Sequence, residues 1–132
     1  MKQSVSHYVM PDEKEEATAE LVHRLGLDGI ENLIYGDEPS SNLFTSLTVG
    51  AHLRFWPRWM DFYLGNTKRY KKQFPDEKAL TAYYGASDTD GWLEEIRKNI
   101  RAALAENPEY LVWHVADCTL EEAWTRQFYY TS

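Results

Sequence analysis

The chain has 132 residues, of which 14 are basic and 21 acidic, for a formal net charge of −7. Hydrophobic residues make up 43% and aromatic residues 14% of the sequence, which supports a packed core and argues against a disordered chain. No apolar run approaches the roughly 18 residues of a membrane-spanning helix, and residues 1–4 lack the apolar stretch of a secretory signal. We therefore expect a cytoplasmic protein with one domain over residues 1–132. The sequence has one cysteine, Cys118, so neither an internal disulfide nor a cysteine metal cluster is expected.

Residues 3–9 alternate polar and apolar side chains, which predicts a short first strand. A helix is predicted to begin at Pro11-Asp12-Glu13, because proline suits a first turn and acidic side chains favour the positive end of the helix dipole. Gly26 should end this helix. A second strand is predicted over residues 28–35, and the polar segment 36–46 has room for at most a stunted helix.

The third strand is predicted to run from about Thr48 to Trp56. A long excursion follows, from Pro57 to about Asp88, with two short helices near residues 68–74 and 76–84. An insertion of this length beside a sheet is more often functional than not.

A long amphipathic helix is then predicted, beginning at Asp88 or Asp90 and ended by Asn107-Pro108. The fourth strand is predicted over residues 110–117, and residues 120–127 look helical. Strands that alternate with helices predict an α/β fold with about four mostly parallel strands and helices packed on the outer face of the sheet.

The third strand carries polar side chains on one face. His52, Arg54 and Trp56 should share that face, whereas the intervening residues are apolar and should pack against helices. A buried arginine requires an anionic partner, and Glu31 on the neighbouring strand is available. Two interpretations stay open: a His–Arg–Glu network that fixes the sheet, or a substrate-binding rim in which Arg54 grips a phosphate or carboxylate.

The fourth strand places His114 at a depth similar to that of His52. A lone strand histidine is usually a satisfied core residue, but paired imidazoles suit a divalent metal or proton transfer. Two histidines without a further ligand are weak grounds for a metal. His7, near the end of the first strand, is a third candidate, and His23 is expected on a helix surface.

An aromatic cluster follows the third strand, formed by Trp56, Trp59, Phe62 and Tyr63. It is either part of the core or the wall of a sugar pocket, because aromatic faces stack on sugar C–H groups. The loop carboxylates of Asp61 and Asp117 are solvated or orient a ligand.

Several functional classes lack their motif. The sequence has no glycine-rich phosphate loop, no Gly-x-Ser-x-Gly elbow and no His-Glu-x-x-His helix, which argues against nucleotide-binding Rossmann proteins, serine hydrolases and zincin proteases. The net charge of −7 disfavours a nucleic acid partner. The one basic run, over residues 68–72, is most simply a solvated helix face.

Three strand motifs together resemble a known family. These are Leu27-Asp28-Gly29-Ile30-Glu31, Gly50-Ala51-His52-Leu53 and Tyr110-Leu111-Val112-Trp113-His114-Val115. They resemble the second to fourth strands of the xylose isomerase-like TIM barrels, which include sugar phosphate isomerases and epimerases and apurinic endonuclease relatives. The string from His52 to Phe62 resembles a bacterial branch described as sugar phosphate isomerases or epimerases. Because a full barrel has eight strands, the resemblance implies a partial (β/α) TIM-type barrel that corresponds to the N-terminal half.

The resemblance also implies a site. Glu31, His52 and His114 match inward-facing polar positions of the family. Strand histidines that resemble His52 and His114 bind zinc in the endonuclease relatives, and the comparable positions more often contact substrate in the epimerases. We predict His52 and His114 as catalytic residues and Glu31, Arg54 and Trp56 as substrate-binding residues, and the resemblance implies a divalent metal in the complete barrel. The family's metal ligands lie mostly on later strands, which this chain lacks.

The function that the resemblance implies is proton transfer next to a sugar carbonyl, on a sugar or sugar phosphate, in a barrel completed by a second copy or by a missing C-terminal half. The isolated chain should show little or no catalysis. Two alternatives remain: a metal-dependent endonuclease acting on abasic DNA, and a non-catalytic half-barrel that assembles with a partner.

Overall fold

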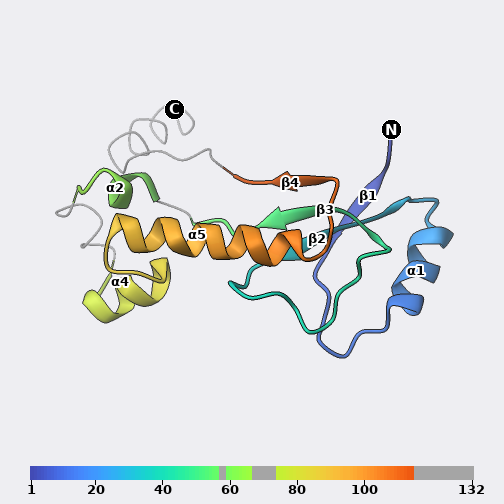
Figure 1. The fold of residues 1–132 in the computed structure, drawn as a ribbon, viewed down its shortest axis with the longest axis horizontal. Helices are drawn as coiled ribbons and strands as arrows, with labels where there is room; N and C mark the ends of the chain where they lie inside the picture. The colour runs from blue at the N-terminus through green and yellow to red at the C-terminus, as the bar shows by residue number, and fades with distance from the viewer. Residues whose placement is uncertain (57–58, 67–73, 115–132) are drawn as a thin grey trace, which may run out of the picture. The chain divides into compact units, whose positions relative to one another are not determined.

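The computed structural model describes residues 1–56, 59–66 and 74–114 (Figure 1). Four strands form one sheet in the order β1-β2-β3-β4, and every neighbouring pair is parallel. Their bounds are Ser4–His7 for β1, Gly29–Ile34 for β2, Thr48–Leu53 for β3 and Tyr110–Val112 for β4. The predicted α/β fold with four parallel strands is confirmed. The sheet is not closed, since β1 and β4 are the edges of the part that the structure describes.

The described helices are α1 (Glu15–Arg24), α2 (Trp59–Tyr63), α4 (Glu77–Tyr84) and α5 (Thr89–Leu104). The chain divides into two compact units, one formed by residues 1–55 and 96–114 and the other containing residues 56–95. The first unit holds the sheet, α1 and the second half of α5. No helix within the described ranges is long and apolar enough to cross a membrane.

The first helix begins later than the sequence predicted. It starts at Glu15 instead of Pro11, because the Glu13 carboxylate accepts hydrogen bonds from the Met10 N–H at 3.0 Å and from the Thr18 hydroxyl, which holds the preceding residues in a turn. Its predicted end is confirmed. Gly26 has a φ of +70°, a left-handed conformation that glycine adopts without the steric cost of a side chain.

Aspartate side chains cap the starts of α4 and α5. Oδ1 of Asp76 accepts the Ala79 N–H at 2.8 Å at the start of α4, and Oδ1 of Asp88 accepts the Gly91 N–H at 2.8 Å at the start of α5. The prediction of helices at these two places is confirmed. The short helix α2 was not predicted, and the helix expected near residues 68–74 falls outside the described residues.

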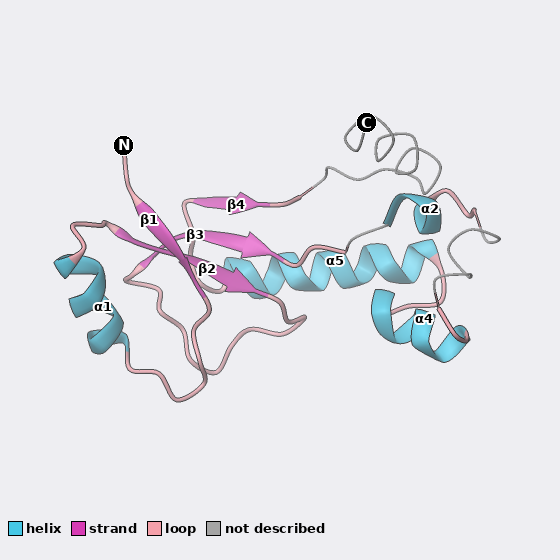
Figure 2. Cartoon of the chain, turned by 180° about the vertical axis from the view of Figure 1, so that it is seen from behind, coloured by secondary structure: helices cyan, strands magenta, loops and turns pink. Residues whose placement is uncertain are grey.

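Helices cover one face of the sheet. Ile34, Ala51 and Leu53 form a buried cluster with Ala102 and Ala103 of α5. Burying such side chains stabilises the fold by about 25 cal/mol per Å² of apolar surface removed from water. Accordingly, α5 lies in front of β2 and β3 in Figure 1 and behind them in Figure 2. A second buried cluster, formed by Val9, Val22, Ile30 and Phe44, extends this layer to α1.

Asn99 of α5 joins the ends of two strands. It is 3% exposed, and its Nδ2 donates to the carbonyl oxygens of Ile34 at 2.9 Å and Gly36 at 2.7 Å. Its Oδ1 accepts the Arg54 N–H at 2.9 Å. One side chain therefore satisfies three backbone groups that leave the sheet ladder where β2 and β3 end.

Candidate functional site

The face of the sheet opposite α5 carries the predicted site residues Glu31 and His52. Side chains alternate along a strand, so the burial of Ala51 and Leu53 against α5 turns His52 to the other face. The strand register places Glu31, Gly50 and Tyr110 in one row across three strands, and His52 opposite Val112 in another. Glu31 and His52 are thus brought to the same face, as the sequence predicted.

A hydrogen-bonded series runs through both predicted catalytic histidines. Nδ1 of His52 lies 2.9 Å from Oε1 of Glu31, and Nε2 of His52 lies 2.7 Å from Nε2 of His114. The two imidazole rings are 4.7 Å apart between centroids. The side chains of His52 and Glu31 are 21% and 18% exposed, whereas His114 is exposed. The series therefore leads from a shielded carboxylate to an imidazole that solvent can reach.

Tyr110 completes the series on the other side of Glu31. Its hydroxyl donates to Oε2 of Glu31 at 3.1 Å and lies 3.2 Å from Oγ of Ser4. To reach this position from β4 the ring crosses β3 at Gly50, where a Cβ would lie 2.3 Å from two ring carbons. The absence of a side chain at position 50 therefore allows Tyr110 to meet the carboxylate on β2.

The hydrogen-bond partners of the two imidazole rings indicate which ring nitrogens carry protons. The Glu31 carboxylate accepts only, so His52 donates through Nδ1–H, and neutral His52 then keeps a lone pair on Nε2. The contact between the two Nε2 atoms requires a proton on one of them, so His114 donates through Nε2–H and keeps its own lone pair on Nδ1. With both rings neutral, the series presents a base at the exposed ring.

The described residues provide only part of a metal site. Zn–N bonds of about 2.0–2.1 Å at tetrahedral angles place two imidazole nitrogens about 3.3 Å apart, so the rings of His52 and His114 must separate slightly to hold one ion. Glu31 is placed as the carboxylate that orients a metal-bound histidine. Within the described ranges no group of three or more His, Cys, Asp or Glu side chains is placed to hold a metal ion. Two ligands do not complete a site, so no chemical step is assigned to a metal.

Arg54 and Trp56 lie beyond the end of β3, which stops at Leu53 and not at Trp56 as predicted. The predicted alternation of side chains between the two faces of the sheet therefore holds as far as His52 and does not extend to Arg54 and Trp56. The Arg54 N–H is bonded to Asn99, and its side chain is partly buried. The sequence predicted Glu31 as the partner of the Arg54 guanidinium. In the structure the two carboxylate oxygens of Glu31 are hydrogen-bonded to His52 and Tyr110.

Trp56 is 3% exposed and belongs to the second unit. Its ring packs edge-on against Trp92, at 6.0 Å between centroids. In the first unit it is Phe55 that lies beside the histidines, with its ring 5.5 Å from that of His114. Substrate binding by Arg54 and Trp56 stays a prediction.

The other two histidines lie elsewhere. His7 pairs with Asn32 in the register, which places it on the helix-covered face, and its Nε2 lies 2.6 Å from Oε1 of Glu13. Its suggested place beside His52 and His114 is therefore wrong, because a side chain at an odd position of β1 points to α1. His23 is exposed on α1, as predicted.

The aromatic residues after β3 pack against other aromatic rings of the second unit. Trp59 stacks on Trp92 at 5.7 Å, and Phe62 stacks on Tyr84 at 4.0 Å between ring centroids. Asp61 is 1% exposed and its Oδ1 accepts from Nδ2 of Asn66 at 2.9 Å. The burial of Trp56 and Phe62, each 3% exposed, fits the core interpretation, whereas Tyr63 is 48% exposed and lies at the surface. Asp117 and Cys118 lie outside the described residues.

Two members of the series were not predicted as site residues, Tyr110 and Ser4. The pattern that indicates Tyr110 is the glycine at position 50, in the strand row between Glu31 and Tyr110. Without the register, however, the sequence does not show which residue crosses that glycine. Comparison of the chain with models of known families, with curated proteins and with solved structures gave no match. The resemblance to the xylose isomerase-like barrels therefore stays a prediction.

Proposed function

We propose that the series Glu31–His52–His114 transfers a proton next to the carbonyl group of a sugar or sugar phosphate, as an isomerase or epimerase does. The observation that supports this most is the 2.7 Å contact between the two Nε2 atoms, because it joins an exposed imidazole to one that is paired with a carboxylate. Histidine is the side chain whose ordinary pKa best suits proton transfer near neutral pH.

The proposed step begins at the exposed ring. Nδ1 of His114 takes a proton from the substrate carbon, and the proton on its Nε2 passes to Nε2 of His52. The positive charge then lies on His52, where the Glu31 carboxylate at 2.9 Å stabilises it. Return of the proton from Nδ1 of His114 to the substrate reverses the shifts. Glu31 and the Tyr110 hydroxyl act as positioning groups in this scheme, since they hold His52 in the required tautomer.

The substrate class follows from the resemblance and from Arg54. Arg54 comes two residues after His52, and a guanidinium can bind a phosphate through two parallel hydrogen bonds. Hydrogen bonding of its N–H to buried Asn99 fixes its backbone beside the end of β3. In this proposal Arg54 binds the phosphate of a sugar phosphate, and His114 removes the proton from the carbon next to the carbonyl.

The open sheet supports a site that other strands complete. β1 and β4 are the edges of the described sheet, and unpaired edges invite pairing. In the proposal, the remaining strands of a TIM-type barrel come from a second copy or from a C-terminal half. A divalent metal held with ligands from those strands would polarise the substrate oxygens. The alternative of an abasic-DNA endonuclease is not favoured, because the net charge is −7.

The experiment that tests the proposal is an NMR titration of the chain labelled with ¹⁵N in its histidine rings. Fructose 6-phosphate is the probe, and fructose and inorganic phosphate are its two parts. We expect saturable shifts of the His52 and His114 ring signals with fructose 6-phosphate, and no epimerisation by the isolated chain. Arg54→Gln should weaken binding of fructose 6-phosphate more than binding of fructose.

The matched control is His23→Ala, which removes an exposed imidazole on α1 and should leave the titration unchanged. His114→Ala should abolish the response at His52. If fructose 6-phosphate and a panel of aldose and ketose phosphates leave the His52 and His114 signals in place, the proposed function is wrong.

A further inference from the structure

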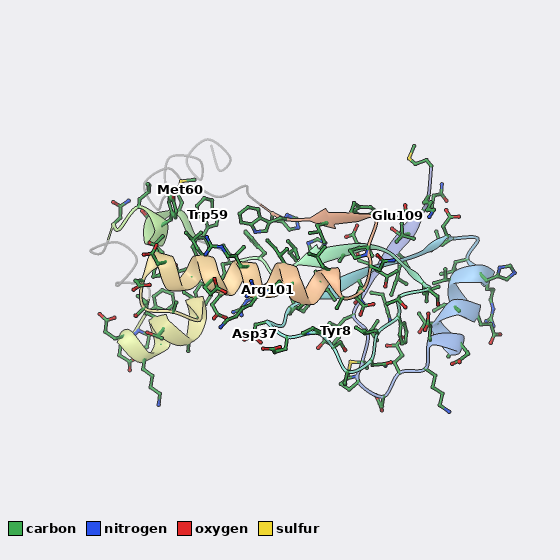
Figure 3. The ribbon with its side chains drawn as sticks, in the orientation of Figure 1. Tyr8, Asp37, Trp59, Met60, Arg101 and Glu109 are labelled. Carbon is green, nitrogen blue, oxygen red and sulfur yellow. The ribbon has the colours of Figure 1, made fainter. Side chains whose placement is uncertain are left out.

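A second site lies on the helix-covered face of the sheet, away from the histidines. A cavity of about 180 Å³ opens where β1 and β2 end. Its lining includes Tyr8, Asn32, Tyr35, Glu38, Ser40 and Glu106, all from the first unit. In Figure 3, Tyr8 lies on the opposite side of this unit from Glu109, which precedes β4. The carboxyl ends of parallel strands are the usual place for ligand sites in open α/β sheets.

Glu106 is the unusual residue of the lining. It is 1% exposed, and its Oε2 accepts the Phe44 N–H at 3.0 Å and faces the Thr48 hydroxyl at 3.4 Å. Its other oxygen, Oε1, is buried and has no hydrogen-bond partner at ordinary distance among the described residues. A buried carboxyl oxygen without a hydrogen bond lowers the stability of the fold. Oε1 of Glu106 is therefore an acceptor that a donor bound in the cavity would satisfy.

The charges around the cavity favour a positive ligand. Among the described residues, the lining contains two carboxyl groups, those of Glu38 and Glu106, and no lysine, arginine or histidine. Burial raises the pKa of Glu106 above its ordinary value near 4.5, and the charge of Glu15 adds to the rise, against the lowering by the hydrogen bonds from Phe44 and Thr48 and by the nearby Asn32 side chain. A cation in the cavity would offset that desolvation and favour the ionised carboxylate.

Two tyrosine rings stand at the entrance. Tyr8 and Tyr35 stack at 5.8 Å between centroids and are 48% and 50% exposed. Aromatic faces attract cations that lie within about 6 Å of the ring centroid. The volume of about 180 Å³ suits a ligand of a few non-hydrogen atoms, well below the ~300–1,000 Å³ of a site for drug-sized molecules.

We propose that this cavity binds a small organic cation, a primary or secondary ammonium, whose N–H donates to Oε1 of Glu106 between the tyrosine rings and the ends of β1 and β2. The site is separate from the histidine series, which occupies the other face of the sheet, and it stands whether or not the proposed function is correct.

The test is an NMR titration of the ¹⁵N-labelled chain with propylamine, which is an ammonium ion at neutral pH, and with 1-butanol as a neutral molecule of similar size. Propylamine should shift the backbone signals of Asn32, Gly36 and Ser40 saturably, and 1-butanol should not. Glu106→Gln keeps an acceptor for Phe44 but puts an amide at Oε1. It should weaken propylamine binding at least about tenfold, because a hydrogen bond to a charged group contributes that much.

Glu109→Gln is the matched control, since it removes one negative charge at an exposed position and should leave propylamine binding unchanged. If Glu106→Gln does not fold, Tyr35→Leu tests the same site and should also weaken binding. Equal responses to propylamine and 1-butanol, or no saturable response to either because ordered water alone fills the cavity, would overturn the proposal. The proposal would also be overturned if Glu106→Gln bound propylamine as tightly as the parent chain. If Glu106→Gln does not fold, the same result in Tyr35→Leu would overturn it.

Discussion

The ring of Tyr110 occupies the space that a side chain at position 50 would need. A Cβ built on Gly50 would lie 2.3 Å from two carbons of the ring and 2.7 Å from its hydroxyl oxygen. That hydroxyl bonds Glu31, which in turn holds His52. Gly50 is therefore a condition for the hydrogen-bonded series across the sheet, although it contributes no side chain to it.

Gly50→Ala should displace the Tyr110 ring and remove its hydrogen bond to Glu31. We expect a loss of about 1–3 kcal/mol in the free energy of unfolding, as for other overpacked positions, measured by urea denaturation. Gly36→Ala is the matched control, because its Cβ would meet no atom closer than 3.6 Å. If both variants unfold at the same urea concentration as the parent chain, Tyr110 does not lie across Gly50.

Asn99→Ala should destabilise the first unit more than any surface change. The substitution removes the hydrogen bonds of the Ile34 and Gly36 carbonyl oxygens and of the Arg54 N–H. We therefore expect a loss of about 3 kcal/mol or more in the free energy of unfolding. Leu104→Ala, on the same helix but 54% exposed, should change it by about 0.5 kcal/mol or less. Chemical denaturation measures both, and equal losses would show that Asn99 does not hold the strand ends.

Thr18→Val should weaken the turn before α1. Burial alone would raise the pKa of Glu13, but hydrogen bonds from Thr18, the Met10 N–H and His7, together with the charge of His7, lower it below its ordinary value near 4.5. A lowered folded-state pKa stabilises the fold above the unfolded-state value, and that stability is lost as pH falls through the folded-state pKa.

The variant lacks one donor to the charged carboxylate, so it should lose about 1.5–3 kcal/mol of unfolding free energy at pH 7 and lose less on acidification than the parent chain. Urea denaturation between pH 7 and pH 3 measures both quantities. Parallel stability curves for the two proteins would contradict the assignment of Thr18 as a donor to Glu13.

Glu106→Gln should remove a loss of stability that occurs as pH rises, whereas the loss linked to Glu13 occurs as pH falls. The pKa of Glu106 is raised in the folded chain, so the folded state binds more protons than the unfolded state above pH 4.5. The parent chain should therefore lose stability as pH rises from about 4.5 through the folded-state pKa, and the glutamine variant should not. Denaturation at a series of pH values should show their difference growing across this window, and a constant difference would contradict the burial of an ionisable Glu106.

The sequence predicted the parallel α/β sheet because period-two and helical patterns alternate clearly along the chain. It also predicted that Glu31, His52 and His114 meet on one face, which the structure bears out. For Glu31 and His52 the prediction rests on alternation within a strand, a local property that the sequence shows directly. His114 was predicted inside a strand over residues 110–117, whereas β4 ends at Val112 and His114 meets His52 from beyond that end.

Other features depend on contacts between distant residues. β3 ends at Leu53 because Asn99, which is 45 residues away from Arg54, takes the Arg54 N–H out of the ladder. The start of α1 depends on Glu13 bonding backward to Met10 as well as forward to Thr18. Tyr110 and Glu106 reach their partners only through the register and the packing of α5. No local pattern shows such contacts, so the sequence predicted none of them.

The most direct test of the histidine series is the scalar coupling between the Nε2 atoms of His52 and His114, measured by NMR on chain labelled with ¹⁵N in its histidine rings. The 2.7 Å contact predicts a coupling across the hydrogen bond, a protonated Nδ1 on His52, and loss of that tautomer preference in Glu31→Leu. Absence of the coupling, together with His52 signals that do not respond to Glu31→Leu or His114→Ala, would show that the two rings act separately and that the proposed proton transfer path does not exist.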